Sequence, residues 1–174
     1  FNRGGNRNYG AIHPKDVASS AFYLNKIVFA SQYRGAGGST GEDEFGGDDL
    51  HDVLKLIDLC EQLPFVYMDN LYMMGISRGG MMTYMAIRED LRIKKAVVVS
   101  GGADAFMSWE ERVDMRNEVY MELIGKTPEE APEEYEKRSA VYWADEIKCP
   151  VLIIHSKNDR RVSYAQAEKM VQKL

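Results

Sequence analysis

The serine at position 77 lies in a glycine-rich turn, within the stretch GISRGG that runs from Gly75 to Gly80. An apolar run precedes this G-x-S-x-G pattern, and a segment of helical periodicity follows it. A strand before and a helix after are typical of a serine held exposed on a sharp turn, near a helix N-terminus that favours developing negative charge. Gly75 and Gly79 suit that turn because larger side chains would collide with neighbouring elements. The pattern predicts that Ser77 is a nucleophile; the alternative is a helix-capping serine in an ordinary turn.

A serine hydroxyl is a poor nucleophile and needs a base, which an acid must orient. Two downstream aspartates follow predicted buried strands: Asp104 comes after AVVVSGG, and Asp159 comes after VLIIHSKN. We favour Asp159, because it lies in a short polar loop between a buried strand and a helix. Asp104 remains the alternative acid, and a turn-forming Asn-Asp pair remains the alternative interpretation of Asp159.

None of the three histidines fits the role of the base. His13 precedes Pro14 and lies upstream of the serine, and His51 falls on the polar flank of a predicted helix. His155 ends a strand shortly before Asp159. We expect a packed or solvated role for each of them.

Alternating apolar strands and amphipathic helices predict a single α/β domain with a mostly parallel sheet flanked by helices. We expect strands at residues 26–33, 70–75, 95–102 and 150–155, and helices at residues 14–25, 48–62, 78–88 and 166–174. Residues 34–47 form a glycine-rich loop in this scheme. Residues 103–147 are polar, rich in acidic side chains and too long for a plain crossover, so we expect a helical excursion there.

Composition narrows the class of partner. The net charge of −5 and the pI of about 5.3 leave no basic field to collect phosphates, so we expect no nucleic-acid partner. No run approaches the ~18 apolar residues of a membrane helix, so we expect no membrane partner. Cys60 and Cys149 belong to no CxxC or Cys/His cluster, so we expect reduced thiols and no metal. Residues 34–47 lack the glycine patterns of nucleotide-binding loops.

Three stretches together resemble the catalytic domain of the prolyl oligopeptidase family within the α/β-hydrolase superfamily: GISRGG, YRGAGGSTGEDEFGGDDLHDV and PVLIIHSKNDRRVSYAQAEKM. The resemblance covers nearly the whole chain. It implies an α/β-hydrolase fold and a serine hydrolase that cleaves a small peptide or ester through an acyl-enzyme, without metal or organic cofactor. It places the catalytic aspartate on Asp159, with Val162 and Gln166 in register. Peptidase and carboxylesterase both stay open, as does the oligomeric state.

The resemblance also implies an oxyanion hole. One donor is the backbone N–H of Arg78, and the other comes from NRGGN at residues 2–6, where Arg3 or the Gly4 amide is the candidate. The alternative for these residues is a plain glycine turn. The family usually has an aromatic residue after the nucleophile, and Arg78 departs from this. A cation there disfavours an apolar proline pocket unless it turns away or pairs with an acid such as Glu42 or Asp43.

In the resembling family the base follows the acid at some distance, beyond Leu174 in this numbering. We therefore expect a fold that is incomplete at both ends, with N-terminal strands and the histidine segment missing from residues 1–174. A hydrolase fold that serves as a non-catalytic binding module is the alternative from another class.

Overall fold

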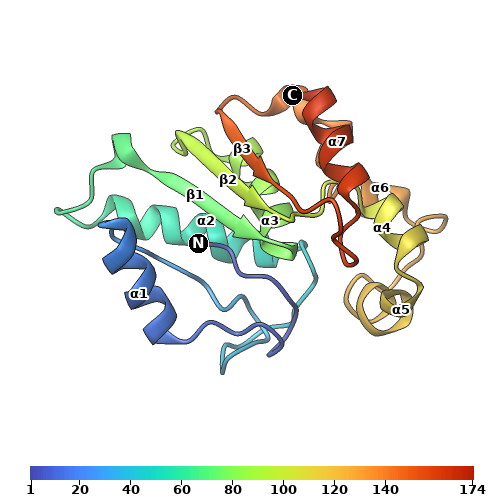
Figure 1. Ribbon diagram of the computed structural model, residues 1–174. Helices are drawn as coiled ribbons and strands as arrows, with labels where there is room; N and C mark the ends of the chain where they lie inside the picture. Colours follow the sequence, from blue (N-terminus) through green and yellow to red (C-terminus); the bar gives the residue numbers. More distant parts are fainter.

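The computed structural model describes residues 1–174, the whole of the sequence. Three parallel strands lie at its centre: β1 (Tyr72–Ile76), β2 (Lys95–Val99) and β3 (Val151–Ile154), in the spatial order β1-β2-β3 (Figure 1). Their last residues, Ile76, Val99 and Ile154, lie level in the register. The sheet confirms the predicted α/β class, and it brings the segments that follow the three strands to one edge.

One face of the sheet carries the core. Helix α3 (Arg78–Glu89) packs on β1 and β2, and α2 (Asp49–Glu61) packs on α3. Helix α3 is buried almost throughout, because small and apolar side chains surround its axis; Met82 and Val98 are completely inaccessible to solvent. The predicted helices at residues 48–62 and 78–88 are thus confirmed, and the turn before α3 leads into a deeply buried helix.

A helical excursion separates β2 from β3, as the sequence predicts. It contains α4 (Ala105–Glu111), α5 (Val113–Met115), the π-helical η2 (Arg116–Met121), α6 (Pro132–Glu136) and the 3-10 helices η3 (Ala140–Tyr142) and η4 (Ala144–Glu146). The rings of Trp109, Tyr120 and Tyr135 pack together within it, with centroids 5.8–6.0 Å apart. Figure 1 shows the excursion beside the sheet, next to α7 (Tyr164–Lys173).

The predicted strand at residues 26–33 is wrong. This segment belongs to no strand and lies beside residues 1–3. The N-terminal amine of Phe1 donates to the Phe29 carbonyl (2.6 Å), and Nε of Arg3 donates to the Gln32 carbonyl (3.0 Å). A strand needs a ladder of backbone hydrogen bonds, and here a terminus and a side chain make the contacts instead. Apolar content favours a strand but does not supply its partner.

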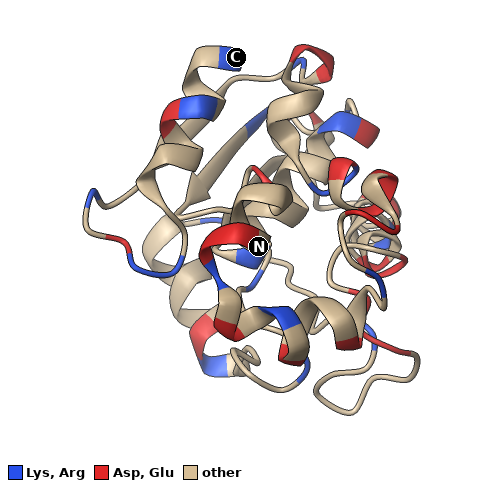
Figure 2. Ribbon diagram, turned by 90° about the vertical axis from the view of Figure 1, so that its right-hand side faces the viewer, with Lys and Arg blue, Asp and Glu red and all other residues tan.

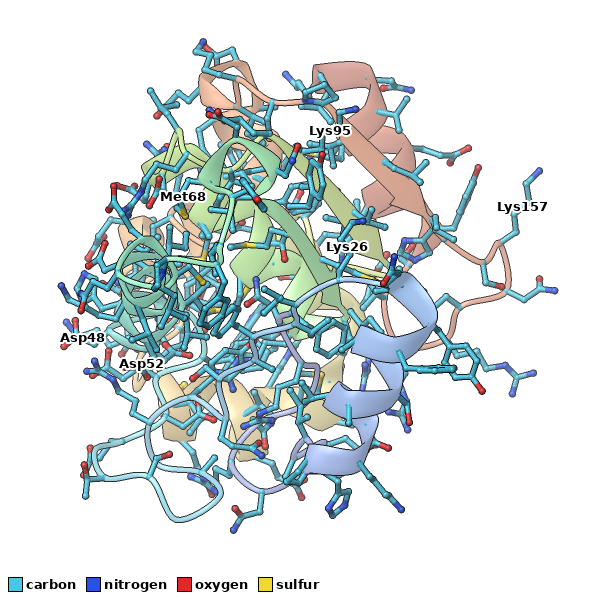
Figure 3. The ribbon with its side chains drawn as sticks, turned by 90° about the vertical axis from the view of Figure 1, so that its left-hand side faces the viewer. Lys26, Asp48, Asp52, Met68, Lys95 and Lys157 are labelled. Carbon is cyan, nitrogen blue, oxygen red and sulfur yellow. The ribbon has the colours of Figure 1, made fainter.

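The second face of the sheet is less covered. Tyr72, Leu152 and Ile154 are about half exposed on it. Helix α1 (Pro14–Leu24) has no buried residue, and neither has the 3-10 helix η1 (Met68–Asn70), which precedes β1. Figure 3 views the molecule from the left-hand side of Figure 1, with Lys26 just beyond α1 and Lys95 at the start of β2. Lys, Arg, Asp and Glu are interspersed over the elements seen in Figure 2. No helix has the length and apolar character that crossing a membrane requires.

The close crossing of α3 over the end of β2 gives a stability prediction. A Cβ at Gly80 would lie 2.5 Å from the Gly101 Cα, too close for any carbon. We expect Gly80→Ala to lower the free energy of unfolding of the full-length gene product by about 1–3 kcal/mol, measured by urea denaturation. Gly102→Ala is the matched control, since its nearest neighbour would be the Met81 Cβ at 3.9 Å. Equal stability of the Gly80→Ala variant and the parent would contradict this packing.

Candidate active site

Ser77 alone forms the turn between β1 and α3. Its backbone angles, φ 56° and ψ −122°, lie in a region that costs a non-glycine residue on the order of 1–3 kcal/mol. The N–H of Ser77 donates to the Val99 carbonyl (2.9 Å), which fixes the turn against the neighbouring strand. The side chain accepts no capping hydrogen bond from α3. Ser77 is half-buried at the edge of the sheet, and its hydroxyl is not used as a helix cap.

The two glycines around the turn are required by space. A Cβ at Gly75 would lie 1.9 Å from the Gly79 carbonyl oxygen, and a Cβ at Gly79 would lie 2.0 Å from the Asn2 carbonyl oxygen. Backbone atoms cannot yield to such a contact as a flexible side chain does. The G-x-S-x-G spacing thus records where three pieces of backbone meet.

Residues 2–4 complete the turn from the other side of β1. The Asn2 N–H donates to the Met74 carbonyl (2.7 Å), and the Asn2 carbonyl accepts from the Ile76 N–H (3.2 Å). This pairing places Gly4 against the serine: a Cβ on Gly4 would lie 3.8 Å from the Ser77 Oγ. The N–H groups of Arg3 and Gly4 donate to no backbone carbonyl. The loop therefore offers backbone donors beside the hydroxyl.

The Arg3 side chain is committed elsewhere. Arg3 is 1% exposed, and its guanidinium donates to four backbone carbonyls, those of Gly4, Arg7, Tyr9 and Gln32, at 2.7–3.1 Å. The Arg3 side chain is therefore excluded as an oxyanion donor. The backbone N–H groups of Arg3 and Gly4 remain as the candidates.

Asp159 follows β3 in a tight polar loop. Its Oδ1 accepts from the N–H groups of Arg161 (2.8 Å) and Val162 (3.0 Å), and its Oδ2 lies 3.7 Å from Nε2 of His155. Burial raises the pKa of this carboxyl, but those two N–H groups, the Ser100 hydroxyl and His155 outweigh it and lower the pKa overall. The carboxylate is thus ionised at neutral pH.

Ser77 and Asp159 lie at the same edge of the sheet, at the ends of β1 and β3. Strand β2 separates them. Two strand spacings of about 4.8 Å each put the two segments roughly 10 Å apart, too far for a direct hydrogen bond between Ser77 and Asp159.

Asp104, the alternative acid, is occupied. It is 2% exposed, caps α4 by accepting from the Met107 N–H (3.1 Å), and pairs with the Lys169 ammonium (2.6 Å). Both carboxylate oxygens of Asp104 therefore already have partners. The geometry favours Asp159 over Asp104 as the acid that would orient a histidine.

No histidine contacts Ser77. The exposed His13 precedes α1, and the side chain of His51 is 64% exposed and lies 3.8 Å from Asp48. The side chain of His155 is buried, and its Nε2 lies 2.9 Å from the Val162 carbonyl oxygen, which holds the Asp159 loop closed. The packed or solvated positions agree with the expectation for all three.

Ser77 opens into a cavity of about 840 Å³. Such a volume suits a small organic or peptide ligand. Gly4 and Gly5 form one wall, and apolar side chains that sequence analysis did not single out form others: Phe45, Met81, Met115, Val119 and Tyr120. The last three come from the excursion, and no local pattern in the sequence marks them as neighbours of Ser77. No group of three or more His, Cys, Asp or Glu side chains is arranged to hold a metal ion.

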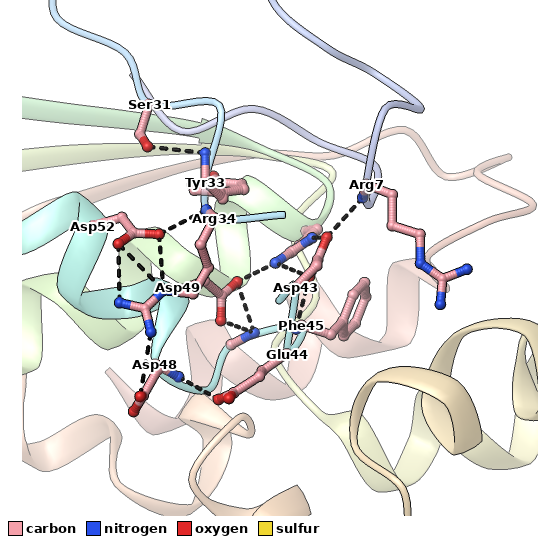
Figure 4. A network of polar contacts seen from close by, with 12 residues as sticks. Arg7, Ser31, Tyr33, Arg34, Asp43, Glu44, Phe45, Asp48, Asp49 and Asp52 are labelled. Atoms are coloured by element: carbon pink, nitrogen blue, oxygen red, sulfur yellow. Dashed lines mark hydrogen bonds and ion pairs between the residues drawn. The ribbon is translucent and has the colours of Figure 1, made fainter. Parts of the chain in front are cut away.

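The side chain of Arg78 points into the protein and pairs with acids, one of the two arrangements that the sequence analysis considered for it. Its guanidinium lies 2.7 Å from Asp43 and also pairs with Asp49, and all three side chains are at most 2% exposed. Asp43 was one of the acids expected as its partner; Glu42 makes no such pair. Asp49 is the first residue of α2, and its fully buried position beside Arg78 is evident only from the structure. Figure 4 shows Asp43 and Asp49 close together within the surrounding network.

The sequence is similar to those of known peptidases. The model of the prolyl oligopeptidase family matches residues 15–174. The chain is 35% identical over 176 residues to the uncharacterized peptidase YtmA of Bacillus subtilis (strain 168), a match that covers 99% of this chain and 66% of that relative. It is 27% identical over 140 residues to the uncharacterized peptidase YuxL of the same organism, covering 73% of this chain and 19% of that relative.

Solved structures give the same placement. The acylaminoacyl peptidase of Pyrococcus horikoshii superposes with a TM-score of 0.72 at 26% identity, over 83% of this chain and 25% of that one. A puromycin-hydrolyzing peptidase of Mycobacterium tuberculosis superposes with a TM-score of 0.69 at 28% identity, over 75% of this chain and 20% of that one. The chain spans less than two thirds of the length of each of these relatives. The fold is that of the α/β-hydrolases, and the chain belongs to the prolyl oligopeptidase family.

Proposed function

We propose that this chain forms the catalytic centre of a serine hydrolase that cleaves a peptide or ester bond through an acyl-enzyme on Ser77. One observation carries the proposal: Ser77 is held in a strained turn, with its hydroxyl free of any capping bond, at the wall of a ligand-sized cavity. Strained backbone persists only where the surrounding structure enforces it. The close backbone contacts at Gly75 and Gly79 support our interpretation of this turn as a nucleophile elbow.

The proposed reaction begins with attack of the Ser77 Oγ on the substrate carbonyl. The resulting oxyanion accepts from the N–H of Arg78, which has no intrahelical acceptor because it opens α3. A second donor is the N–H of Gly4 or Arg3, since Gly4 lies against Ser77. The N-terminal end of α3 adds a favourable field for the developing negative charge.

The base in this scheme is a histidine other than His13, His51 and His155. It would occupy the space between the ends of β1 and β3, with the Asp159 carboxylate as the group that orients it. This chain covers 66% of the length of the relative that matches 99% of it.

The substrate proposed is a short peptide or an aminoacyl amide. The cavity has apolar walls at Phe45, Met115 and Val119, and Arg78 reaches it already neutralised by two carboxylates. The related structures are an acylaminoacyl peptidase and a puromycin-hydrolyzing peptidase, which favours amide cleavage over a carboxylesterase.

Labelling tests the nucleophile directly. The full-length gene product is treated with a fluorophosphonate and analysed by intact mass and peptide mapping. We expect one adduct, on Ser77, and none in Ser77→Ala; Ser156→Ala, which removes an exposed serine beyond β3, should label like the parent.

The absence of an adduct on a well-folded protein would contradict an activated serine. The binding-module alternative would then be preferred.

The pH dependence tests the acid. The pKa of Asp159 is lowered, so its carboxylate stays charged as the pH falls well below neutrality. The acid limb of kcat/KM should therefore follow a histidine near its ordinary pKa of about 6.5, not a carboxyl group. Asp159→Asn should lower kcat by about 10³–10⁴-fold.

Asp90→Asn is the control, since Asp90 is a carboxylate of lowered pKa in a surface pair with Arg92. An Asp159→Asn variant with the parent's kcat would exclude Asp159 as the orienting acid.

Paired substrates separate peptidase from esterase. A p-nitroanilide and a p-nitrophenyl ester of the same N-acyl amino acid are compared by kcat/KM. We expect the amide to be cleaved at a rate well above that of the Ser77→Ala variant. Turnover of the ester alone would assign the chain to the carboxylesterases.

A further inference from the structure

The side chain of Arg78 occupies an unusual place for a residue next to a nucleophile. Its Nη2 lies 2.7 Å from Oδ1 of Asp43 and contacts Asp49, and its Nη1 donates to Oδ2 of Asp43 (2.8 Å). The guanidinium also lies over the rings of Tyr33 (4.8 Å) and Phe45 (4.9 Å). Burial lowers the pKa of this guanidinium, but the two carboxylates outweigh it and raise the pKa overall. A permanent cation is thus held in a closed, fixed setting.

The buried cluster balances its own charge. Arg3 lies over the Tyr33 ring as well, at 4.9 Å, and it is as deeply buried as Arg78. Two guanidiniums, from Arg3 and Arg78, face two carboxylates, from Asp43 and Asp49, around one aromatic ring. The net charge of the four side chains is zero, which limits the cost of taking them out of water.

The two carboxylates accept hydrogen bonds from backbone N–H groups of two loops, one around Arg7 and one at residues 45–46. Asp43 accepts from the N–H groups of Arg7 (2.6 Å) and Phe45 (3.0 Å), and Asp49 accepts from the Gly46 N–H (2.9 Å). Figure 4 shows these bonds running from Asp43 and Asp49 to the segments on either side. Arg78 itself donates to the Gly5 carbonyl (3.2 Å). Residues 3–7 are thereby fastened to the residue that follows Ser77.

We infer that Arg78 is a positioning residue that fixes the two oxyanion donors relative to each other. Its own N–H is one donor, and its side chain fixes the loop that carries the Gly4 N–H, the other. A buried ion pair is weak evidence for stability, because an apolar side chain of the same volume often serves as well. Directional hydrogen bonds to Gly5 and, through Asp43, to Arg7 are what an apolar side chain lacks. This inference rests on the proposed function of Ser77.

The test uses the full-length gene product and a charge-balanced variant. Arg78→Met/Asp49→Asn removes one charge of each sign, leaves Arg3 opposite Asp43, and keeps an acceptor for the Gly46 N–H. Arg88→Met is the matched control: Arg88 lies on the same helix, pairs with Glu146 (2.6 Å) and covers the Trp143 ring (4.8 Å), far along α3 from Ser77.

We expect the double variant to melt cooperatively and to label on Ser77, with kcat for the p-nitroanilide about 100-fold lower and KM within about threefold of the parent. Its affinity for a peptide aldehyde, which needs the oxyanion donors, should fall by a similar factor. The control should keep the parent's kcat. Parental kcat in a folded double variant, or a raised KM alone, would overturn the inference.

A conservative variant covers the case of a double variant that does not fold. Arg78→Lys keeps the charge but cannot bridge two carboxylates and a carbonyl, so kcat should fall about tenfold at unchanged KM. Unchanged kcat in Arg78→Lys would also overturn the inference. If the fluorophosphonate does not label Ser77 in the parent protein, both the proposed function and this inference are contradicted. If Ser77 is labelled in the parent but the Arg78 variants keep the parent's kcat, only this inference is contradicted.

Discussion

Three backbone segments meet at the turn around Ser77, and the rest of the site depends on how closely they approach. The Asn2 carbonyl oxygen, the end of β1 and the first turn of α3 leave no space for a side chain at Gly75 or Gly79. The approach is held by backbone hydrogen bonds between Asn2 and β1 and by the bond from Ser77 to β2. Because no atom there can retreat, Ser77 keeps its positive φ and its hydroxyl stays at the edge of the sheet. Loosening any one segment would release the other two.

A buried charge cluster extends this constraint outward. The Arg78 cation, which follows Ser77, looks unsuited to an apolar pocket, yet Asp43 and Asp49 neutralise it, and Tyr33 and Phe45 enclose it. The part of the cavity wall next to this cluster therefore consists of the neutralised Arg78 and the ring of Phe45. The departure from the usual aromatic residue is thus compensated by a carboxylate pair from the glycine-rich loop and the start of α2. Such compensation couples the loop to the turn, which a simple aromatic replacement would not do.

The elements with local signals were predictable. Apolar runs of four to six residues identified β1, β2 and β3, helical periodicity identified α2 and α3, and glycine spacing identified the turn at Ser77. Residues 26–33 carry the same apolar signal but form no strand, because pairing depends on a partner that the segment's own composition does not encode. The partners of Arg78 could be guessed only as nearby acids. The cavity walls from Met115 to Tyr120 depend on how a long excursion folds back, and no short-range pattern records that.

The most direct measurement is a crystal structure of the full-length gene product after reaction with a phosphonate. We expect a phosphorus atom bonded to the Ser77 Oγ. We also expect one phosphoryl oxygen within about 2.7–3.1 Å of both the Arg78 nitrogen and a backbone nitrogen of the loop at residues 3–4. A phosphoryl oxygen that faces solvent, or an adduct on another residue, would contradict the claim that these three backbone segments together form the reaction centre.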